Sequence, residues 1–420
     1  MSEGKPMVAN QEVAERPGRP LSATLTAANG QVGRLVAIAV AAVLLYYVTV
    51  SDRVTLDSFL PLADGFLHGR LYIDQPMPWL ELVPRAEGGW YSPFPPMPAI
   101  ALMPFVALFG PGFDQGIATA LFGGANVALV WLLLRRSGVA LVSANWLTAA
   151  FAVGSVHWWA AGTGSVWLHA QVVAVFFALL ALHLAIRRRW PLLAGLFLGL
   201  AAASRLPMGL TLPLYLALYL RLPFPPSLRM PAAAELRSAI ALLAGLAVPA
   251  ALVAAYNVAR YGSPFVFGYE LIPGVLDEPW YAKGLLSIDY LPRHLHLMFM
   301  RGFDLVDTFP WFRPNWSGAS LLLTMPILLW LVKARSRTPL IAYGWIAIVL
   351  ALIPDVLHGA PGFAQFGYRF ILDVLPIMLL MLGWVFRDRI SVEARAAILI
   401  GIAVNAYGVW AVTVIGFVSY

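Results

Sequence analysis

The sequence contains no cysteine and few charged residues. Of its 420 residues, 12% are Asp, Glu, Lys or Arg, about half of the roughly 25% that is typical of soluble domains. The absence of cysteine excludes disulfides, thiolate metal sites and cysteine nucleophiles. So few charges cannot cover a water-facing surface. Internal repeats, low-complexity tracts and the alternating pattern of membrane barrels are also absent.

Hydrophobic residues make up 60% of the chain and form long runs. Residues 35–50, 117–134 and 166–186 approach or reach the roughly 20 residues with which a helix crosses a bilayer. Backbone amides in lipid must be satisfied internally, so these runs predict helices. We predict an all-α, polytopic transmembrane bundle of about 11–12 crossings, formed by residues 34–420 as a single domain. Residues 1–33, polar and of mixed charge, are expected to be a disordered cytoplasmic tail before a retained first helix.

Basic residues gather in five short loops, which the positive-inside rule places in the cytoplasm without any need for nucleic acid. These loops contain Arg135 and Arg136; Arg187 to Arg189; Arg221, Arg229 and Arg237; Lys333, Arg335 and Arg337; and Arg387, Arg389 and Arg395. Segments 51–95, 257–316 and 354–369 hold most of the acids and are predicted to be outer loops. Segment 96–110 is short and proline-rich, and a full crossing there would place Arg135 outside. We interpret it as an interfacial or re-entrant helix on the outer side.

Two arginines are predicted to lie at membrane depth near the outer face. Between the basic residues Arg189 and Arg221, each half of the apolar stretch is too short to cross the bilayer. The stretch therefore predicts a hairpin of two short helices with Arg205 at its tip. Arg205 either binds a phosphate or pairs with an intramembrane acid such as Asp373. Arg369 lies where a helix enters the membrane from outside, and it either binds a lipid phosphate or extends to the headgroups.

Further polar and aromatic residues are candidates for supporting roles. Tyr91 belongs to the aromatic and proline-rich segment 88–98, which suits either a membrane-interface belt or a sugar-stacking surface. His169 and Gln171 begin a crossing; the histidine could bind metal, hold a phosphate or orient an acid, or serve as a core residue. Glu270 ends the polar segment 257–270 of the second outer loop. The first outer loop is rich in acids, which are either functional at the membrane boundary or merely solvated.

These motifs, taken in order, resemble the GT-C superfamily of polytopic glycosyltransferases, which includes protein mannosyltransferases and aminoarabinose transferases. The motifs are the acidic first loop from Asp57 through Ala63-Asp64 to Gly69-Arg70-Leu71-Tyr72, Tyr91 to Pro98 with Leu108-Phe109-Gly110, Gly195 to Gly199 leading to Ala203-Ser204-Arg205, Tyr256-Asn257 with Tyr261-Gly262-Ser263-Pro264, and Gly367-Tyr368-Arg369 with Pro376. The resemblance covers most of the chain from about residue 35. The chain lacks the large soluble C-terminal domain of some relatives.

The resemblance implies an inverting transfer of a hexosyl or pentosyl group from a polyprenyl-phosphate sugar to a glycan, lipid or protein acceptor, on the outer face of the cytoplasmic membrane. It implies a first-loop carboxylate as the base, matched to Asp57 and in second place to Asp52. His169 stands where aminoarabinose transferases carry a second functional aspartate. Their phosphate-binding lysine is missing, so the donor phosphate would fall to Arg205 and Arg369. No cofactor is implied with certainty, although a divalent metal is possible.

Two other classes of protein fit a polytopic chain. A transporter or lipid flippase of cell-envelope precursors would carry charges in mid-helix and often show repeated halves. A non-enzymatic assembly or export subunit would need neither clustered outer acids nor deep arginines. The outward position of the charges favours the enzyme.

Overall fold

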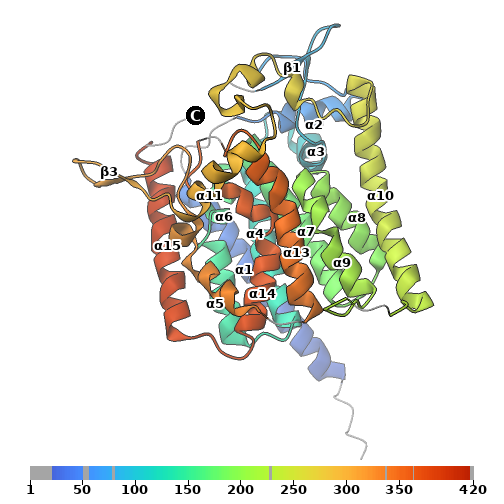
Figure 1. Cartoon of the computed structure of the whole chain (residues 1–420), viewed down its shortest axis with the longest axis vertical. Coiled ribbons are helices and arrows are strands. Elements are labelled where there is room, and N and C mark those ends of the chain that lie inside the picture. The colour runs from blue at the N-terminus through green and yellow to red at the C-terminus, as the bar shows by residue number, and fades with distance from the viewer. Residues whose placement is uncertain are drawn as a thin grey trace, which may run out of the picture.

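The computed structural model describes residues 21–50, 56–77, 81–226, 229–335, 338–362 and 364–416, and gives only the backbone for residues 21–29. It is a helical bundle, capped at one end by short elements (Figure 1). The α-helices are α1 (Leu21–Thr49), α2 (Phe59–Leu67), α3 (Met97–Phe109), α4 (Gln115–Arg136), α5 (Leu141–Ala152), α6 (His157–Thr163), α7 (Val166–Ile186), α8 (Pro191–Ala202), α9 (Leu212–Tyr219), α10 (Ala233–Tyr261), α11 (Leu291–Phe299), α12 (Leu321–Thr324), α13 (Pro339–Leu357), α14 (Leu375–Val385) and α15 (Val392–Thr413). The 3₁₀ segments are η1 (Leu206–Thr211), η2 (Tyr269–Leu271), η3 (Val275–Asp277), η4 (Pro279–Tyr281), η5 (Ile288–Tyr290), η6 (Pro326–Lys333) and η7 (Arg369–Asp373).

The described part of the chain contains six helices long and apolar enough to cross a membrane, which confirms the predicted polytopic helical fold. They are Gly30–Thr49 within α1, and α4, α7, α10, α13 and α15. Shorter apolar helices lie among them: α3, α5, α8, the continuous η1–α9 and α14. α4 and α7 are the most buried of the long helices and form the centre of the bundle. The count of 11–12 crossings stays a prediction.

The first helix starts earlier than the sequence suggests. α1 begins at Leu21, within the segment 1–33 for which a disordered tail is predicted. Residues 1–20 of that segment lie outside the described residues.

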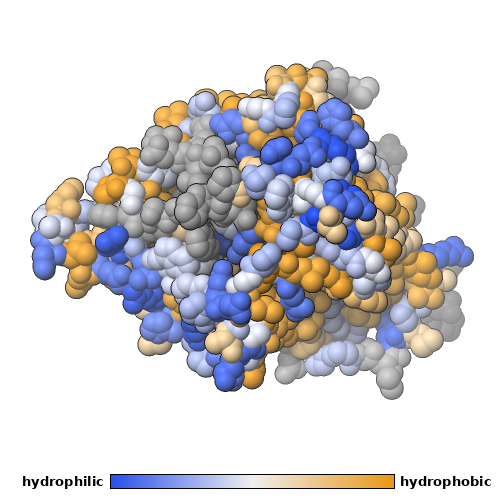
Figure 2. Space-filling view, turned by 90° about the horizontal axis from the view of Figure 1, so that it is seen from above, coloured by the Kyte–Doolittle hydropathy of each residue, from blue (hydrophilic) through white to orange (hydrophobic). Residues whose placement is uncertain are grey.

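The basic loops meet at the end of the bundle opposite the capping elements. The Ala140 amide donates to the carbonyl of Arg387 at 2.7 Å, and the Tyr219 hydroxyl donates to the carbonyl of Arg189 at 2.8 Å. Four of these loops are thereby joined in pairs. The capping end carries α2, α3, α11 and both hairpins (Figure 1), and hydrophilic residues are spread over it (Figure 2). This separation is the arrangement that charge patterning predicts.

α8 and α10 pack through glycines, and their backbones come unusually close. A Cβ added at Gly195 would lie 1.8 Å from the carbonyl oxygen of Leu242, and one at Gly245 would lie 1.9 Å from that of Leu192. Gly195 and Gly199 form a small-xxx-small pair, which permits such an approach between membrane helices. Only glycine fits at these two contacts.

The apolar stretch between Arg189 and Arg221 turns back after α8, as the sequence predicts. α8 ends at Ala202, residues 203–205 form the tip, and η1 with α9 returns to the basic end. The first turn of the returning arm is 3₁₀, with Pro207 near its start.

Two short antiparallel hairpins at the capping end were not predicted from the sequence. β1 (Val83–Pro84) pairs with β2 (Trp90–Tyr91), and β3 (Asp304–Leu305) pairs with β4 (Phe312–Arg313). Strands of two residues leave no alternating pattern long enough to recognise.

Candidate functional site

Arg205 lies at the predicted helical tip and is held by two carboxylates. Its Nη2 donates to Asp373 Oδ2 at 2.8 Å and to Asp355 Oδ1 at 3.1 Å, and its Nε donates to Asp373 Oδ2 at 3.1 Å. Asp373 is the last residue of η7, and Asp355 lies near the end of α13. The ion pair that the sequence left open as an alternative is therefore formed. Two buried acids fix the guanidinium in orientation while its side chain still faces a cavity.

Arg369 lines the same cavity, so the structure brings the two predicted arginines together. The cavity measures about 450 Å³. The guanidinium carbons of Arg205 and Arg369 lie 5.3 and 5.6 Å from the ring centre of Phe370. The amide nitrogen of Gln171 donates to the carbonyl of Arg369 at 3.0 Å. Gln171, predicted as a supporting residue, thus holds the backbone that carries the second arginine.

A chain of hydroxyl and carboxyl groups forms another part of the wall of this arginine cavity. The Tyr281 hydroxyl donates to the Tyr269 oxygen at 3.4 Å, and the Tyr269 hydroxyl donates to Glu81 Oε2 at 2.9 Å. Burial raises the pKa of Glu81 and the negative charge of Glu278 raises it further, whereas the Tyr269 hydrogen bond and the charge of Arg369 lower it. The net pKa is above the ordinary value, so Glu81 is a second candidate for proton transfer.

Large aromatic side chains complete the arginine cavity. Trp167, Trp280 and Trp316 line it, and the last two are stacked with ring centres 5.2 Å apart. Flat rings beside charged groups provide a surface on which a sugar ring can lie against apolar faces while its hydroxyls reach polar atoms.

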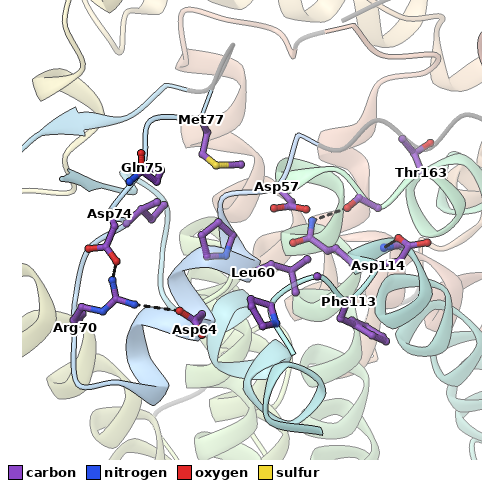
Figure 3. Close-up of a pocket in the computed structure, with 17 residues that line it drawn as sticks. Asp57, Leu60, Asp64, Arg70, Asp74, Gln75, Met77, Phe113, Asp114 and Thr163 are labelled. Carbon is purple, nitrogen blue, oxygen red and sulfur yellow. Dashed lines mark hydrogen bonds and ion pairs between the residues drawn. The ribbon is translucent and has the colours of Figure 1, made fainter. Parts of the chain in front are cut away.

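Asp57 lies in a different cavity, of about 540 Å³, between residues 57–77 and the start of α4 (Figure 3). In this acidic cavity Arg70 bridges Asp64 and Asp74, whereas Asp57 and Asp114 lie towards the other end. The Asp57 side chain is half-buried. Burial raises the pKa of Asp57 from 3.8 to about 7, and the negative charge of Asp114 contributes to the rise. At that pKa a carboxylate is an efficient base at neutral pH.

A proline-rich segment lies between the two cavities. The residue after Asp57, Ser58, contacts Ser92 with 3.4 Å between the hydroxyl oxygens, and the following residues 93–95 line the arginine cavity. Phe94 stacks edge-on against Phe59 of the first loop and Trp167 of α7, with ring centres 6.2 and 6.4 Å apart. Asp57, Arg205 and Arg369 are therefore distributed over two cavities on either side of this segment.

A third, apolar cavity of about 430 Å³ adjoins the first two. It lies among α3, α8 and α10, and its walls include Ile100, Leu200 and Leu252. Arg70 lines both this apolar cavity and the acidic one. Arg70 therefore places a charged group where the apolar cavity borders the acidic one.

The remaining predicted residues take mainly structural positions. His169 is buried: its Nδ1 lies 2.7 Å from Thr119 Oγ1 and its Nε2 lies 3.4 Å from the carbonyl of Pro98, so it ties α7 to α4 and α3. Tyr91 packs edge-on against Tyr261 at 5.6 Å. Glu270 is exposed, and its neighbour Tyr269 lines the arginine cavity instead. Asp52 lies outside the described residues.

No metal centre is found in the part of the chain that the structure describes. No group of three or more His, Asp or Glu side chains there converges as metal ligands would. Four acids of the two cavities and their walls instead pair with arginines: Asp64 and Asp74 with Arg70, and Asp355 and Asp373 with Arg205.

Sequence reasoning missed Arg260 as well as Glu81. Arg260 lies in the last turn of α10, where its Nη1 donates to the carbonyl of Ser92 at 2.5 Å and its Nη2 donates to Asn257 Oδ1 at 2.8 Å. Its guanidinium carbon lies 3.7 Å from the ring centre of Tyr256. Among the described residues it has no carboxylate partner. The available signal was an arginine close to the outer end of an apolar run, beside Tyr256-Asn257.

Comparison with known proteins gives likenesses of fold. No family model matches the chain, and no curated protein matches its sequence. Among solved structures it is similar to ArnT from Cupriavidus metallidurans bound to undecaprenyl phosphate, with a TM-score of 0.49, 17% identity and coverage of 90% of this chain and 63% of that one. The apo state of that ArnT gives a TM-score of 0.47 and 18% identity, again over 90% and 63% of the two chains.

The archaeal oligosaccharyltransferase AglB from Archaeoglobus fulgidus, in complex with an inhibitory peptide and a dolichol-phosphate, gives a TM-score of 0.45 and 16% identity over 89% of this chain and 55% of that one. Both neighbours are GT-C glycosyltransferases, the group that the sequence resembles. The chain spans less than two thirds of their lengths. At TM-scores below 0.5 the likeness does not carry an activity over to this chain.

Proposed function

We propose that this chain is a glycosyltransferase that moves a hexosyl or pentosyl group from a polyprenyl-phosphate donor to an acceptor hydroxyl on the outer face of the cytoplasmic membrane, with inversion at the anomeric carbon. One observation carries the proposal. A half-buried carboxylate with a pKa near 7 and two arginines occupy adjoining cavities at the same end of a membrane bundle. Sugar transfer from a lipid phosphate needs a base and cations for the leaving phosphate.

Asp57 is the proposed base. In its ionised form it accepts the proton of the acceptor hydroxyl while the oxygen attacks C1 of the sugar. The acceptor, which is a glycan, lipid or protein, would approach through the acidic cavity, where Asp64 and Asp74 are neutralised by Arg70. Asp57 is left to take up the proton.

Arg369, with Arg205 beside it, is the proposed site for the donor phosphate. As the bond from C1 to the phosphate oxygen breaks, negative charge grows on polyprenyl phosphate, and fixed guanidinium groups stabilise it without reorganising. Asp355 and Asp373 keep Arg205 in place before the donor arrives. Trp280 and Trp316 provide the stacking surface for the sugar.

The segment around Phe94 must move before the donor and the acceptor can come into contact. Because this segment separates the two cavities, donor binding would move the Phe94 ring and bring C1 within reach of Asp57. The apolar cavity among α3, α8 and α10 has the chemistry to take part of an isoprenoid chain. The N-terminus and the basic loops would lie in the cytoplasm and the site outside.

Transfer from radiolabelled polyprenyl-phosphate sugars in proteoliposomes tests the proposal. We expect Asp57→Asn to lower the transfer rate by about 10²–10⁴-fold, as loss of a general base does. Arg369→Ala should lower the rate and raise the KM for the donor. Asp277→Asn is the matched control, because Asp277 is an exposed outer acid that lines none of the three cavities.

Glu81→Gln separates the two candidate bases. If the Glu81 variant loses transfer and the Asp57 variant keeps it, the base is in the arginine cavity and our assignment is wrong. If the wild type moves donor lipid across the bilayer but transfers no sugar from any donor, the chain is a transporter and the proposal fails.

A further inference from the structure

The hairpin of β3 and β4, residues 304–313, carries large apolar side chains on its surface. Leu305 is 79% exposed, Phe309 69%, Trp311 57% and Phe312 49%. In Figure 1 the hairpin projects sideways from the bundle beside the upper end of α15. The cavities described above do not include it. Four such side chains within ten residues need a partner that takes them out of water.

The contacts of the hairpin with α15 fix its depth. The Tyr407 hydroxyl of α15 donates to the carbonyl of Phe312, and the Phe309 ring lies edge-on to Trp410 with centres 6.4 Å apart. α15 ends at Thr413, so both contacts fall within its last two turns. At 1.5 Å per residue, Tyr407 lies about 9 Å from the end of the helix.

The length of α15 puts this part of the helix at the boundary between the hydrocarbon core and the headgroups. α15 has 22 residues and is therefore about 33 Å long, slightly more than the roughly 30 Å hydrocarbon core. Its outward side exposes Leu399 and Ile400 in mid-helix, as a lipid-facing surface does. Trp410 and Tyr407, near the end, are residue types that concentrate at the headgroup level.

The charges of the hairpin lie mostly at its base. Arg301 pairs with Asp304 at 2.5 Å, and Asn315 donates to the other oxygen of Asp304 at 2.9 Å. Arg313 closes the second strand, and Asp307 is exposed near the turn. The charges of these two acids and two arginines cancel, so electrostatic attraction to anionic lipids adds nothing to the binding. The apolar area alone has to provide the binding.

We propose that the β3–β4 hairpin inserts its apolar tip into the outer leaflet at the boundary of headgroups and acyl chains, as an extension of the lipid-facing surface of α15. The partner is the phospholipid bilayer itself. The hairpin anchors the capping end at one depth and one tilt relative to the bilayer, independently of the reaction that the site performs.

The absence of native cysteine permits a direct test with single spin labels. Phe309→Cys carries a nitroxide in the full chain, reconstituted in nanodiscs of zwitterionic phospholipid. We expect collisions with oxygen to exceed those with a water-soluble nickel chelate. Ile400→Cys on α15 sets the value for hydrocarbon. Asp289→Cys, at an exposed position of η5, sets the value for water, where nickel collisions dominate.

Leu305→Cys provides a second reporter in β3, in case a label at Phe309 disturbs the turn. The same depth is expected when anionic lipid replaces zwitterionic lipid. The proposal is overturned if both hairpin labels match the Asp289 value in folded protein. It is also overturned if the labels report dipolar coupling between chains, because the occupant is then a second copy of this protein.

Discussion

The charge of Asp114 should shift the pH at which the proposed transfer activity appears. Asp114 raises the pKa of Asp57, with burial as the larger cause, so that Asp57 titrates near pH 7 rather than near 3.8. Asp114 also caps α4, because its Oδ1 accepts from the amide of Gly116 at 2.7 Å. Asparagine caps a helix as well as aspartate does. Asp114→Asn therefore removes the charge and keeps the cap.

The size of the effect follows from the ionised fraction of Asp57. The base acts only when ionised, so activity should rise with pH through about 7 and level off above it. At pH 6 about one tenth of wild-type Asp57 is ionised, and at pH 8 about nine tenths. Without the charge of Asp114 the pKa falls, and the acid limb moves to lower pH. The rate at pH 6, relative to the plateau, should rise by up to about tenfold, whereas at pH 8 it should hardly change.

The assay is single-turnover transfer of labelled sugar from a synthetic polyprenyl-phosphate donor in detergent micelles, from pH 5.5 to 8.5. The donor phosphodiester stays ionised throughout, so the profile reports the protein. Asp277→Asn, which removes an exposed acid, should leave the midpoint in place. Coincident profiles for wild type and Asp114→Asn, or a midpoint that moves upwards, would refute the reasoning.

Three other substitutions test the packing that holds the site. Arg205→Met leaves two buried carboxylates without their cation, and thermal unfolding in detergent should show a loss of about 3–5 kcal/mol. Gln171→Leu removes the donor to the carbonyl of Arg369 and should cost about 1 kcal/mol; steady-state assays should show a higher KM for the donor with a smaller change in kcat. Gly195→Ala already forces a Cβ against the carbonyl of Leu242, so size-exclusion chromatography should show aggregated protein.

Much of the arginine cavity was predictable because the constraints on it are local. Two apolar halves too short to cross a bilayer require a turn, and Arg205 occupies that turn whatever its partners are. Arg369 follows from its place at the start of an apolar helix after a polar loop. Length and polarity decide both positions, and neither depends on distant contacts.

The partners of these residues were harder to predict because they come together only through the tertiary fold. Glu81 reaches the cavity through the β1–β2 hairpin and the 3₁₀ segments that carry Tyr269. Asp355 is one acid near the end of an apolar helix, and the sequence does not tell on which face of that helix its side chain lies. The division into two cavities by the segment around Phe94 arises from aromatic packing, which leaves no periodic signal in the sequence.

The glycine contact between α8 and α10 has a consequence for the spacing of cations at the capping end. α8 runs up to the turn that carries Arg205, and α10 runs alongside it to Arg260, so each helix delivers one guanidinium. At Gly195 and Gly245 the two helix backbones are in direct contact, with no side chain between them. The spacing of the two helix backbones that lead to these arginines is thus set by main-chain contact. Any enlargement at either glycine should therefore change the spacing of Arg205 and Arg260, although neither arginine has been substituted.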